Sequence, residues 1–169
     1  SHKVIFLDRD NTINKDVPYC PSPEHFEFLE GSLEAIKLFY LAGFRIIVIT
    51  NQSGLSRGFF DLNALDEIHL KMCNEVKSVG AKITDIFFCG CLPDSGCPDR
   101  KPGVGLFLQA EKKYRINKDE SFMIGDSESD IEAGTNFGLQ TIKIVPEGED
   151  LKTKANHQVP NLLAAAIKI

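Results

Sequence analysis

Short runs of apolar residues recur along the chain, and each run ends in polar or charged positions. Runs of this kind are typical of strands that are buried on both faces of a parallel sheet. They predict strands at residues 4–7, 45–50, 83–88, 121–125 and 141–145. Between these runs the apolar residues recur at helical spacing, and several of the stretches end at a glycine. They predict helices at residues 31–42, 62–79, 102–114, 129–137 and 162–169.

Strands that alternate with helices predict an α/β protein. We expect a three-layer, Rossmann-like fold in which right-handed crossovers build a central parallel sheet. Residues 14–29 contain prolines and little apolar periodicity, so we expect a structured loop near the end of the first strand. A chain of 169 residues leaves no room for a large cap domain, and it predicts a single domain over residues 1–169.

Composition excludes several classes of protein. Apolar residues make up 43% of the chain and charged residues 25%, which is ordinary for a globular protein and excludes a disordered one. The net charge of −5 disfavours binding to nucleic acid or to an anionic membrane. The longest apolar stretches fall well short of the ~20 residues that a membrane span needs. We expect a monomer without nucleic-acid or membrane partners.

Charged residues at positions 8–10 interrupt the first apolar run, so we expect no export signal and a cytoplasmic protein. Five cysteines, an odd number, fit free thiols in a reducing compartment better than a disulfide framework. Three of them cluster at residues 89–97, whereas Cys20 and Cys73 are interpreted as packing residues. The histidines show no paired spacing and are interpreted as ordinary surface or core residues: His2, His25, His69 and His157.

Two carboxylates follow the first predicted strand, at Asp8 and Asp10. If the chain stays extended there, both side chains share one face. Their charges would repel unless a cation lies between them, and Mg²⁺ prefers oxygen ligands. One carboxylate could then attack a substrate while the other moves protons. The alternative is a solvated acid pair or a helix cap.

Asp126 follows the fourth predicted strand and could supply another oxygen ligand to the same metal. Asp130 lies four residues further on, at the first turn of a predicted helix. There it could cap the helix, interact with its dipole, or hydrogen-bond a metal ligand from outside. Capping alone is the alternative for Asp130.

Two further polar segments follow or precede predicted elements. Residues 50–54, Thr-Asn-Gln-Ser-Gly, follow the second strand, and a hydroxyl with loop amides can hold phosphate oxygens. The same residue types are also common in ordinary turns. Arg100 and Lys101 precede the helix predicted at 102–114, and two fixed cations suit a phosphate. A solvated basic pair is the alternative.

The order of these motifs is more specific than any one of them. Asp-x-Asp, then Thr, then Lys, then Gly-Asp-x-x-x-Asp, each at a strand end, resembles the haloacid-dehalogenase-like (HAD-like) phosphatases. Residues 6–14, 50–58 and 100–102, with the cysteine loop, more closely resemble the D-glycero-D-manno-heptose 1,7-bisphosphate 7-phosphatases. Histidinol-phosphate phosphatases are the nearest relatives of that family. The resemblance spans roughly residues 4–144.

The resemblance implies a Mg²⁺-dependent hydrolase that removes the C7 phosphate of a heptose bisphosphate through an aspartyl-phosphate. Asp8 would be the nucleophile, and Asp10 would protonate the leaving alcohol and then activate water. Asp8, the backbone carbonyl of Asp10 and Asp126 would hold Mg²⁺. Asp130 would hydrogen-bond one of these ligands without binding the ion itself. Thr50 and Lys101 would stabilise the transferring phosphoryl group. Contacts with the sugar phosphate would come from Asp16, Tyr19, Asn51, Gln52, Ser53, Arg57 and Arg100.

Two positions near the proposed magnesium ligands depart from the family pattern. Asn11 stands where the family usually has Gly, but Asn tolerates left-handed backbone angles, so we expect a Gly-like turn there. Ser127 follows Asp126, where the heptose enzymes often carry Lys. This second departure bears on the substrate more than on the reaction.

The cysteine loop at residues 89–99 departs further. The family pattern is Cys-x-His, a spacer, then Cys-x-Cys, and it binds a structural Zn²⁺. Here Cys91 stands at the His position and Asp99 at the position of the last Cys. With Cys89 and Cys97, these residues could form a tetrahedral zinc site that orders the loop before Arg100 and Lys101. A metal-free loop with free thiols is the alternative.

Other functions remain to be weighed. Within the same class, the alternatives are a histidinol-phosphate phosphatase or another small-metabolite phosphatase. A receiver-like phospho-acceptor module also uses Asp, Thr and Lys at strand ends, but Asp10 favours turnover over retention of the phosphoryl group. A non-catalytic domain built around the cysteines is disfavoured by Asp8, Asp10, Lys101 and Asp126.

Overall fold

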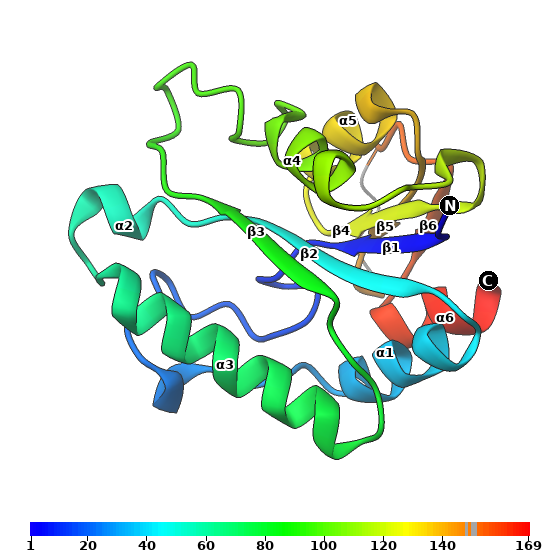
Figure 1. Cartoon of the computed structure of the whole chain (residues 1–169), viewed down its shortest axis with the longest axis horizontal. Coiled ribbons are helices and arrows are strands. Elements are labelled where there is room, and N and C mark those ends of the chain that lie inside the picture. Colours follow the sequence, from blue (N-terminus) through cyan, green and yellow to red (C-terminus); the bar gives the residue numbers. More distant parts are fainter. Residues whose placement is uncertain (148, 150–151) are drawn as a thin grey trace.

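The computed structural model describes residues 1–147, 149 and 152–169, which fold around one six-stranded sheet (Figure 1). All neighbouring strands are parallel, and their order across the sheet is β3-β2-β1-β4-β5-β6. The five predicted strands are confirmed, and a sixth follows them. The strands are β1 (Val4–Leu7), β2 (Arg45–Asn51), β3 (Asp85–Cys89), β4 (Phe122–Gly125), β5 (Gln140–Ile144) and β6 (His157–Val159).

Helices cover both faces of the sheet, which confirms the three-layer α/β fold (Figure 1). One face packs against α1 (Ser32–Leu41), α3 (Leu62–Ser78) and α6 (Leu162–Lys168). The other packs against α4 (Gly105–Lys113) and α5 (Glu128–Phe137). Within the described residues, no insertion forms a separate cap domain. The remaining helices are short: α2 (Gly54–Arg57), η1 (Pro23–His25) and η2 (Lys118–Glu120).

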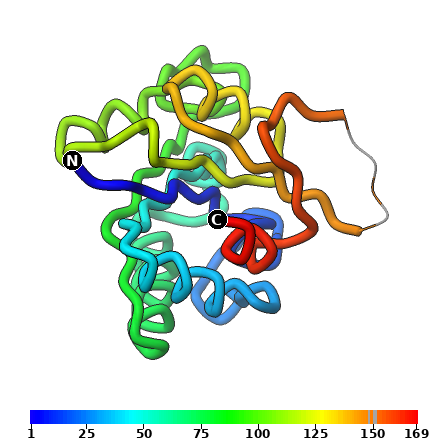
Figure 2. The backbone as a smooth tube through the Cα atoms, turned by 90° about the vertical axis from the view of Figure 1, so that its right-hand side faces the viewer, coloured from blue at the N-terminus to red at the C-terminus, as the bar shows by residue number. Residues whose placement is uncertain are grey.

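Alternate side chains of the central strand enter the two different cores. Ile5 and Leu7 pack on the side of α1, α3 and α6, whereas Val4 and Phe6 pack on the side of α4 and α5. All four side chains are fully buried. This two-sided burial is why the strand is a continuous apolar run rather than an alternating pattern. Figure 2 shows the C-terminal helix α6 lying beside α1, where it completes the first of these layers.

The start of α4 and the presence of β6 differ from the sequence prediction. The helix predicted to start at residue 102 starts at Gly105, because the preceding residues form turns: Gly103 N–H donates to Arg100 C=O, and Gly105 N–H donates to Pro98 C=O. The strand β6 was not predicted. Only Val159 of its three residues is buried, so no apolar run marks it in the sequence.

The central strands β1 and β4 lie side by side, and the strand order runs in opposite directions from this point. Ligands of open α/β sheets bind beyond the carboxyl ends of the strands at such a switch point. These ends lie at the left of Figure 1, near α2 and the cysteine loop. The loop at residues 14–29 is structured as expected, because Lys15 N–H donates to Glu27 C=O and Leu29 N–H donates to Ile13 C=O.

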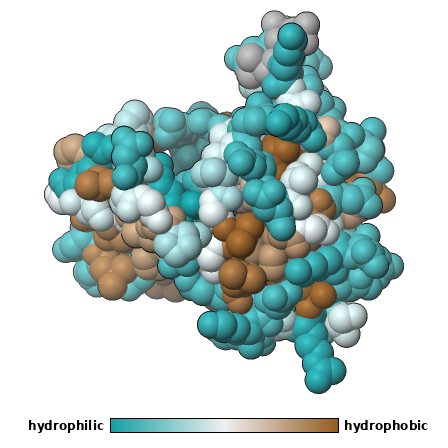
Figure 3. Space-filling model, turned by 90° about the horizontal axis from the view of Figure 1, so that it is seen from above, coloured by the Kyte–Doolittle hydropathy of each residue, from teal (hydrophilic) through white to brown (hydrophobic). Residues whose placement is uncertain are grey.

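In the described part of the chain, no helix combines the length and the apolar character that crossing a membrane requires. Figure 3 shows the α4–α5 side of the molecule, which is mostly hydrophilic with smaller apolar areas. A hollow separates the left part of this surface from the rest.

Candidate active site

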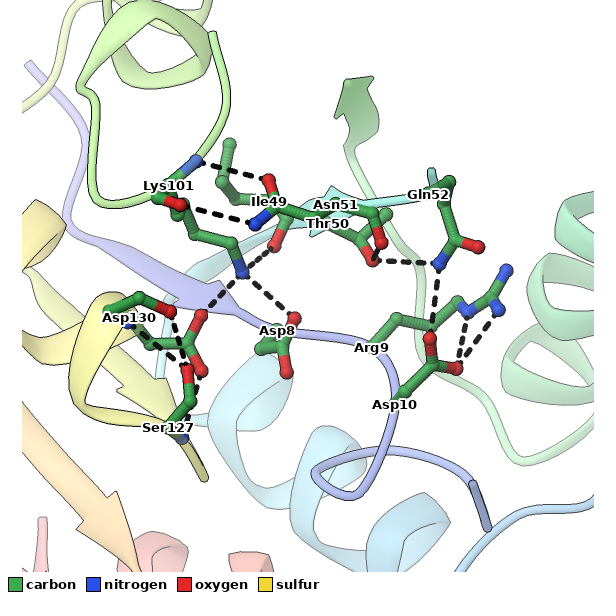
Figure 4. A network of polar contacts seen from close by, with 11 residues as sticks. Asp8, Arg9, Asp10, Ile49, Thr50, Asn51, Gln52, Lys101, Ser127 and Asp130 are labelled. Carbon is green, nitrogen blue, oxygen red and sulfur yellow. Dashed lines mark hydrogen bonds and ion pairs between the residues drawn. The ribbon is translucent and has the colours of Figure 1, made fainter. Parts of the chain in front are cut away.

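A buried lysine joins two carboxylates at the centre of the strand ends (Figure 4). Lys101 Nζ donates to Asp8 Oδ1 at 2.8 Å, to Asp130 Oδ1 and to the C=O of Ile49 at 2.8 Å. Burial by itself would lower the pKa of Lys101, but the charges of Asp130 and Asp8 outweigh it and raise that pKa. The ammonium therefore stays charged beside Asp8.

Three carboxylates from two strand ends and one helix gather at this point. Carboxylate oxygens of Asp8, Asp126 and Asp130 all lie within 4.8 Å of one another. Burial and then the charge of Asp130 raise the pKa of Asp8 well above its ordinary value, although Lys101 acts in the opposite direction. The same two causes raise the pKa of Asp126. Three acids against one lysine leave an excess of negative charge, which a cation would offset.

Asp130 is fixed by the start of α5. Its side chain accepts from the N–H of Ser127, and the Ser127 hydroxyl accepts from the N–H of Asp130, so the two form a capping box. Capping and the ion pair with Lys101 therefore occur together rather than as alternatives. Ser127, at the position where the heptose enzymes often carry Lys, serves here as the helix cap.

Asp10 lies outside the cluster of the other three acids, but it lines the same cavity as Asp8. The chain turns after β1, where the Arg9 C=O accepts from the N–H groups of residues 12–14. Asp10 Oδ1 accepts from Arg9 and from Asn14, and Asp10 Oδ2 accepts from Gln52 at 3.2 Å. In this turn Asn11 has a φ of 63°, which confirms the expected left-handed turn.

The end of β2 and the residue that follows it, Gln52, hold the site together. Gln52 Nε2 donates to both Asp10 and the Thr50 hydroxyl, which are 3.2 and 3.0 Å away. The Asn51 side chain accepts from the N–H of Lys101 and donates to its C=O. Asn51 and Gln52, which we expected at the substrate, are thus also part of the frame that positions Lys101 and Asp10.

Two cavities adjoin at these residues. One, of about 260 Å³, is lined by Asp8, Lys101, Asp126 and Asp130 among others. The second, of about 300 Å³, is lined by Tyr19, Gln52, Ser53 and neighbouring residues. Asp10, Asp16 and Asn51 line both cavities. A group bound in the first cavity and a group bound in the second would therefore meet beside Asp10.

The remaining residues expected at the substrate lie at different distances from these cavities. Asp16, Tyr19 and Ser53 line the second cavity. The Arg57 guanidinium lies over the Tyr19 ring, 5.6 Å from its centre, and is not among the lining residues. Phe59, which the sequence did not single out, also packs against Tyr19, with the two ring centres 4.5 Å apart.

The predicted zinc ligands are only partly brought together. Sulfur atoms of Cys89, Cys91 and Cys97 lie within 4.8 Å of one another, and Cys89 Sγ is 3.8 Å from Cys97 Sγ. The carboxylate of Asp99 is not in this group. It lies against Gly105 at the start of α4, in the space that the Cβ of any other residue at position 105 would fill. Arg100 donates to the C=O of Cys91 at 3.1 Å, so it is held by the loop.

This arrangement defines the class of protein. An aspartate that directly follows the first strand, a buried lysine beside it and a carboxylate cluster at the switch point are the parts of a HAD-like hydrolase. A family model described as HAD-hydrolase-like matches residues 99–167.

Comparison with known proteins identifies the family. The chain is 40% identical over 137 residues to the D-glycero-beta-D-manno-heptose-1,7-bisphosphate 7-phosphatase of Helicobacter pylori, covering 80% of this chain and 79% of that protein. It is 35% identical over 171 residues to the protein of the same name from Rhodopseudomonas palustris, covering 97% and 94%. The crystal structure of D,D-heptose 1,7-bisphosphate phosphatase from B. bronchiseptica, complexed with magnesium and phosphate, matches with a TM-score of 0.87 and 32% identity, covering 98% and 97%.

The chain belongs to the family of HAD-like phosphatases that contains these relatives. It is a phosphatase. This excludes the two alternatives outside that class, the receiver-like module and the non-catalytic domain.

Proposed function

We propose that this phosphatase hydrolyses a phosphomonoester through a phosphate ester on Asp8, with Mg²⁺ as its cofactor. The position of Asp10 carries this proposal, because Asp10 lines both the cavity at Asp8 and the adjoining one. A phosphate in the first cavity and its alcohol in the second would place the breaking P–O bond beside a carboxyl group. That is where an acid–base residue is needed.

The residues of the first cavity fit Mg²⁺. Asp8, Asp126 and the backbone carbonyl of Asp10 would hold the ion, and all three offer the oxygen ligands that it prefers. The excess of negative charge among Asp8, Asp126 and Asp130 is a reason for a divalent cation there. When bound, the ion would offset charge on the phosphate oxygens. Magnesium and phosphate in the B. bronchiseptica structure support this assignment.

The chain's own residues account for the two halves of the reaction. An oxygen of Asp8 attacks phosphorus, the bond from phosphorus to the alcohol oxygen breaks, and that oxygen takes a proton from Asp10. Asp10 then takes a proton from water as the water attacks phosphorus and the bond to Asp8 breaks. Throughout, the Lys101 ammonium and the Thr50 hydroxyl stabilise the equatorial oxygens of the transferring group.

We propose the C7 phosphate of D-glycero-D-manno-heptose 1,7-bisphosphate as the substrate. The names of relatives that are 32–40% identical support it. Carboxylate, amide and hydroxyl groups in the second cavity suit the hydroxyls of a sugar: Asp16, Asn51, Gln52 and Ser53. Arg57 and Arg100, which lie outside that lining, are candidates for the second phosphate.

We also propose a structural Zn²⁺ at Cys89, Cys91 and Cys97. Three clustered sulfurs suit zinc, although Asp99 would have to leave Gly105 to complete a tetrahedral set. This metal would order the loop and take no part in the chemistry.

The test is phosphate release with Mg²⁺ from the α and β anomers of the heptose bisphosphate, histidinol phosphate and simple sugar phosphates. Asp8→Asn serves as the blank. We expect a strong preference for one heptose anomer that disappears in Asp8→Asn. Preference for histidinol phosphate would move the protein to the other branch of the family. Release that persists in Asp8→Asn would remove the proposed nucleophile.

A further inference from the structure

A buried cation lies directly behind Asp10. Only 1% of the Arg9 side chain is exposed, and it is the largest fully buried side chain among the described residues. A buried guanidinium is costly unless its N–H groups are paired. Its partners are Asp10 Oδ1, at 3.0 Å from Nε and 2.9 Å from Nη2, and Nε2 of His69, at 3.2 Å from Nη1.

His69 comes from α3, sixty residues further along the chain, and it is buried beside the ring of Phe88. Burial, followed by the charge of Arg9, lowers the pKa of His69 to about 3, so the ring is neutral. A guanidinium can only donate hydrogen bonds. His69 Nε2 is therefore the acceptor, and the ring proton is on Nδ1.

This chain of contacts ends at one oxygen of the proposed acid–base group. Asp10 Oδ1 accepts three N–H donors, two from Arg9 and one from Asn14, so its lone pairs are occupied. Among the described residues, Asp10 Oδ2 accepts a hydrogen bond only from the Gln52 amide. Oδ2 is thus the oxygen that remains to carry a proton. The Arg9 backbone is fixed as well, because its C=O accepts from three amides of the following turn.

We propose that His69 and Arg9 are positioning residues, and that through Arg9 the helix α3 fixes the orientation of the Asp10 carboxyl group. The inference rests on the proposed function, since it assumes that Asp10 exchanges protons with the leaving alcohol and with water. Neither residue touches the substrate. Loss of His69 leaves Nη1 of the buried Arg9 unpaired. The Arg9 guanidinium, and with it the Asp10 carboxyl group that it holds, is then free to turn.

The test compares two substrates that differ in their need for an acid. An alkyl leaving group, as in a sugar phosphate, must be protonated when it departs, whereas the nitrophenolate of 4-nitrophenyl phosphate is stable without a proton. The quantity kcat/KM covers the steps up to release of the alcohol. A loss of acid positioning therefore lowers kcat/KM for the sugar phosphate more than for 4-nitrophenyl phosphate.

We expect His69→Leu to lower kcat/KM for the best sugar phosphate about tenfold more than for 4-nitrophenyl phosphate, a part of the ~10²–10⁴-fold worth of an acid–base group. His69→Gln, which can still accept from Arg9, should restore most of the loss. Met72→Ala is the matched control, because Met72 is fully buried on the same helix within the apolar core. It should weaken the fold and leave the ratio between the two substrates unchanged.

An equal loss for both substrates in His69→Leu, or no rescue by His69→Gln, would overturn the inference. Should His69→Leu not fold, Arg9→Lys gives the same test, because Lys keeps the charge and loses the fork. A wild-type protein that hydrolyses neither substrate would instead overturn the proposed function, and this is seen before any variant is compared.

Discussion

The part of the chain that the structure describes contains two groups of three side chains that could bind a metal ion, and the fold holds them in different ways. Asp8 and Asp126 each directly follow a central strand, and Asp130 is fixed by the capping box of α5. Lys101 donates buried hydrogen bonds to Asp8 and Asp130 and a third to the C=O of Ile49. Cys89 is the buried last residue of β3, whereas Cys91 and Cys97 are half-buried in the loop that follows.

The difference teaches what each group needs. The sheet brings the carboxylates together even though their charges repel. This repulsion destabilises the fold, but it leaves a site ready for a cation and a phosphate. Of the three cysteines only Cys89 lies in a strand, and the expected fourth ligand, Asp99, lies elsewhere. We therefore expect the acid cluster to keep its shape without a bound metal, whereas the cysteine loop should need its metal to stay ordered.

The largest expected effect follows Asp8→Asn. Turnover should fall on the order of 10⁴-fold or more, because the nucleophile is lost. The free energy of unfolding, measured by urea denaturation with the metal chelated, should not fall, because burial and Asp130 already disfavour the Asp8 charge. The control is Asp94→Asn, an exposed acid of the cysteine loop, which should alter neither quantity. A large drop in stability with Asp8→Asn would show that the carboxylate stabilises the fold.

The adjacent residues Arg100 and Lys101 allow the sharpest comparison of the two regions. Lys101→Met leaves the buried Asp8 and Asp130 without their cation, so we expect a loss of about 3–5 kcal/mol in the free energy of unfolding. Arg100→Met removes one hydrogen bond to the Cys91 carbonyl, so about 1 kcal/mol is expected. Both are measured by urea denaturation with a chelator present. Equal losses would mean that the acid cluster and the loop are not held differently.

The pH dependence of the unfolding free energy should show that His69, in the network with Arg9 and Asp10, is buried in its neutral form. The pKa of His69 is about 3 in the fold and ordinary in the unfolded chain, near 6.5. Between these values the unfolded chain binds the extra proton, so stability is fully present above pH 6.5 and is lost as the pH falls toward 3.

The loss is about 1.4 kcal/mol for each pH unit inside that window. His69→Gln lacks this titration, so its unfolding free energy relative to the wild type should improve as the pH falls from 6.5 to 4.5. Other acids titrate in both proteins and cancel in the difference. A difference that stays constant over this range would mean that His69 is not buried in its neutral form.

Much of the fold could be predicted from the sequence, because two-sided burial gives apolar runs and helices end at glycine. The strand-end positions of Asp8, Thr50 and Asp126 followed from those runs. The strand β6 could not be predicted, since a three-residue edge strand with one buried side chain has no pattern.

The network behind the site could not be predicted either. Asp10 lies outside the acid cluster because the chain leaves the sheet after Leu7, and alternation along a strand no longer applies. The contact between Arg9 and His69 joins residues sixty positions apart, without a motif. Only the packing of α3 against the sheet reveals why a histidine is buried there.

The smallest expected effect on kcat comes from a change in the cysteine loop. This change tests whether the acid cluster works independently of the three cysteines. Cys97→Ser should reduce bound zinc, measured by metal analysis of reduced protein, from near one per chain to near none. The kcat should change far less than the ~10²-fold typical of a lost acid–base group. This is because Asn51 holds the Lys101 backbone through two hydrogen bonds that do not involve the loop.

The KM for a bisphosphate should rise several-fold in the same variant, because Arg100 depends on the Cys91 carbonyl for its position. Cys73→Ser, a half-buried thiol on α3 outside the cluster, is the control and should change neither zinc nor KM. If kcat fell as far as it does with Lys101→Met, the loop would be part of the catalytic frame. The hydrogen bonds of Asn51 would then be too weak to hold Lys101 by themselves.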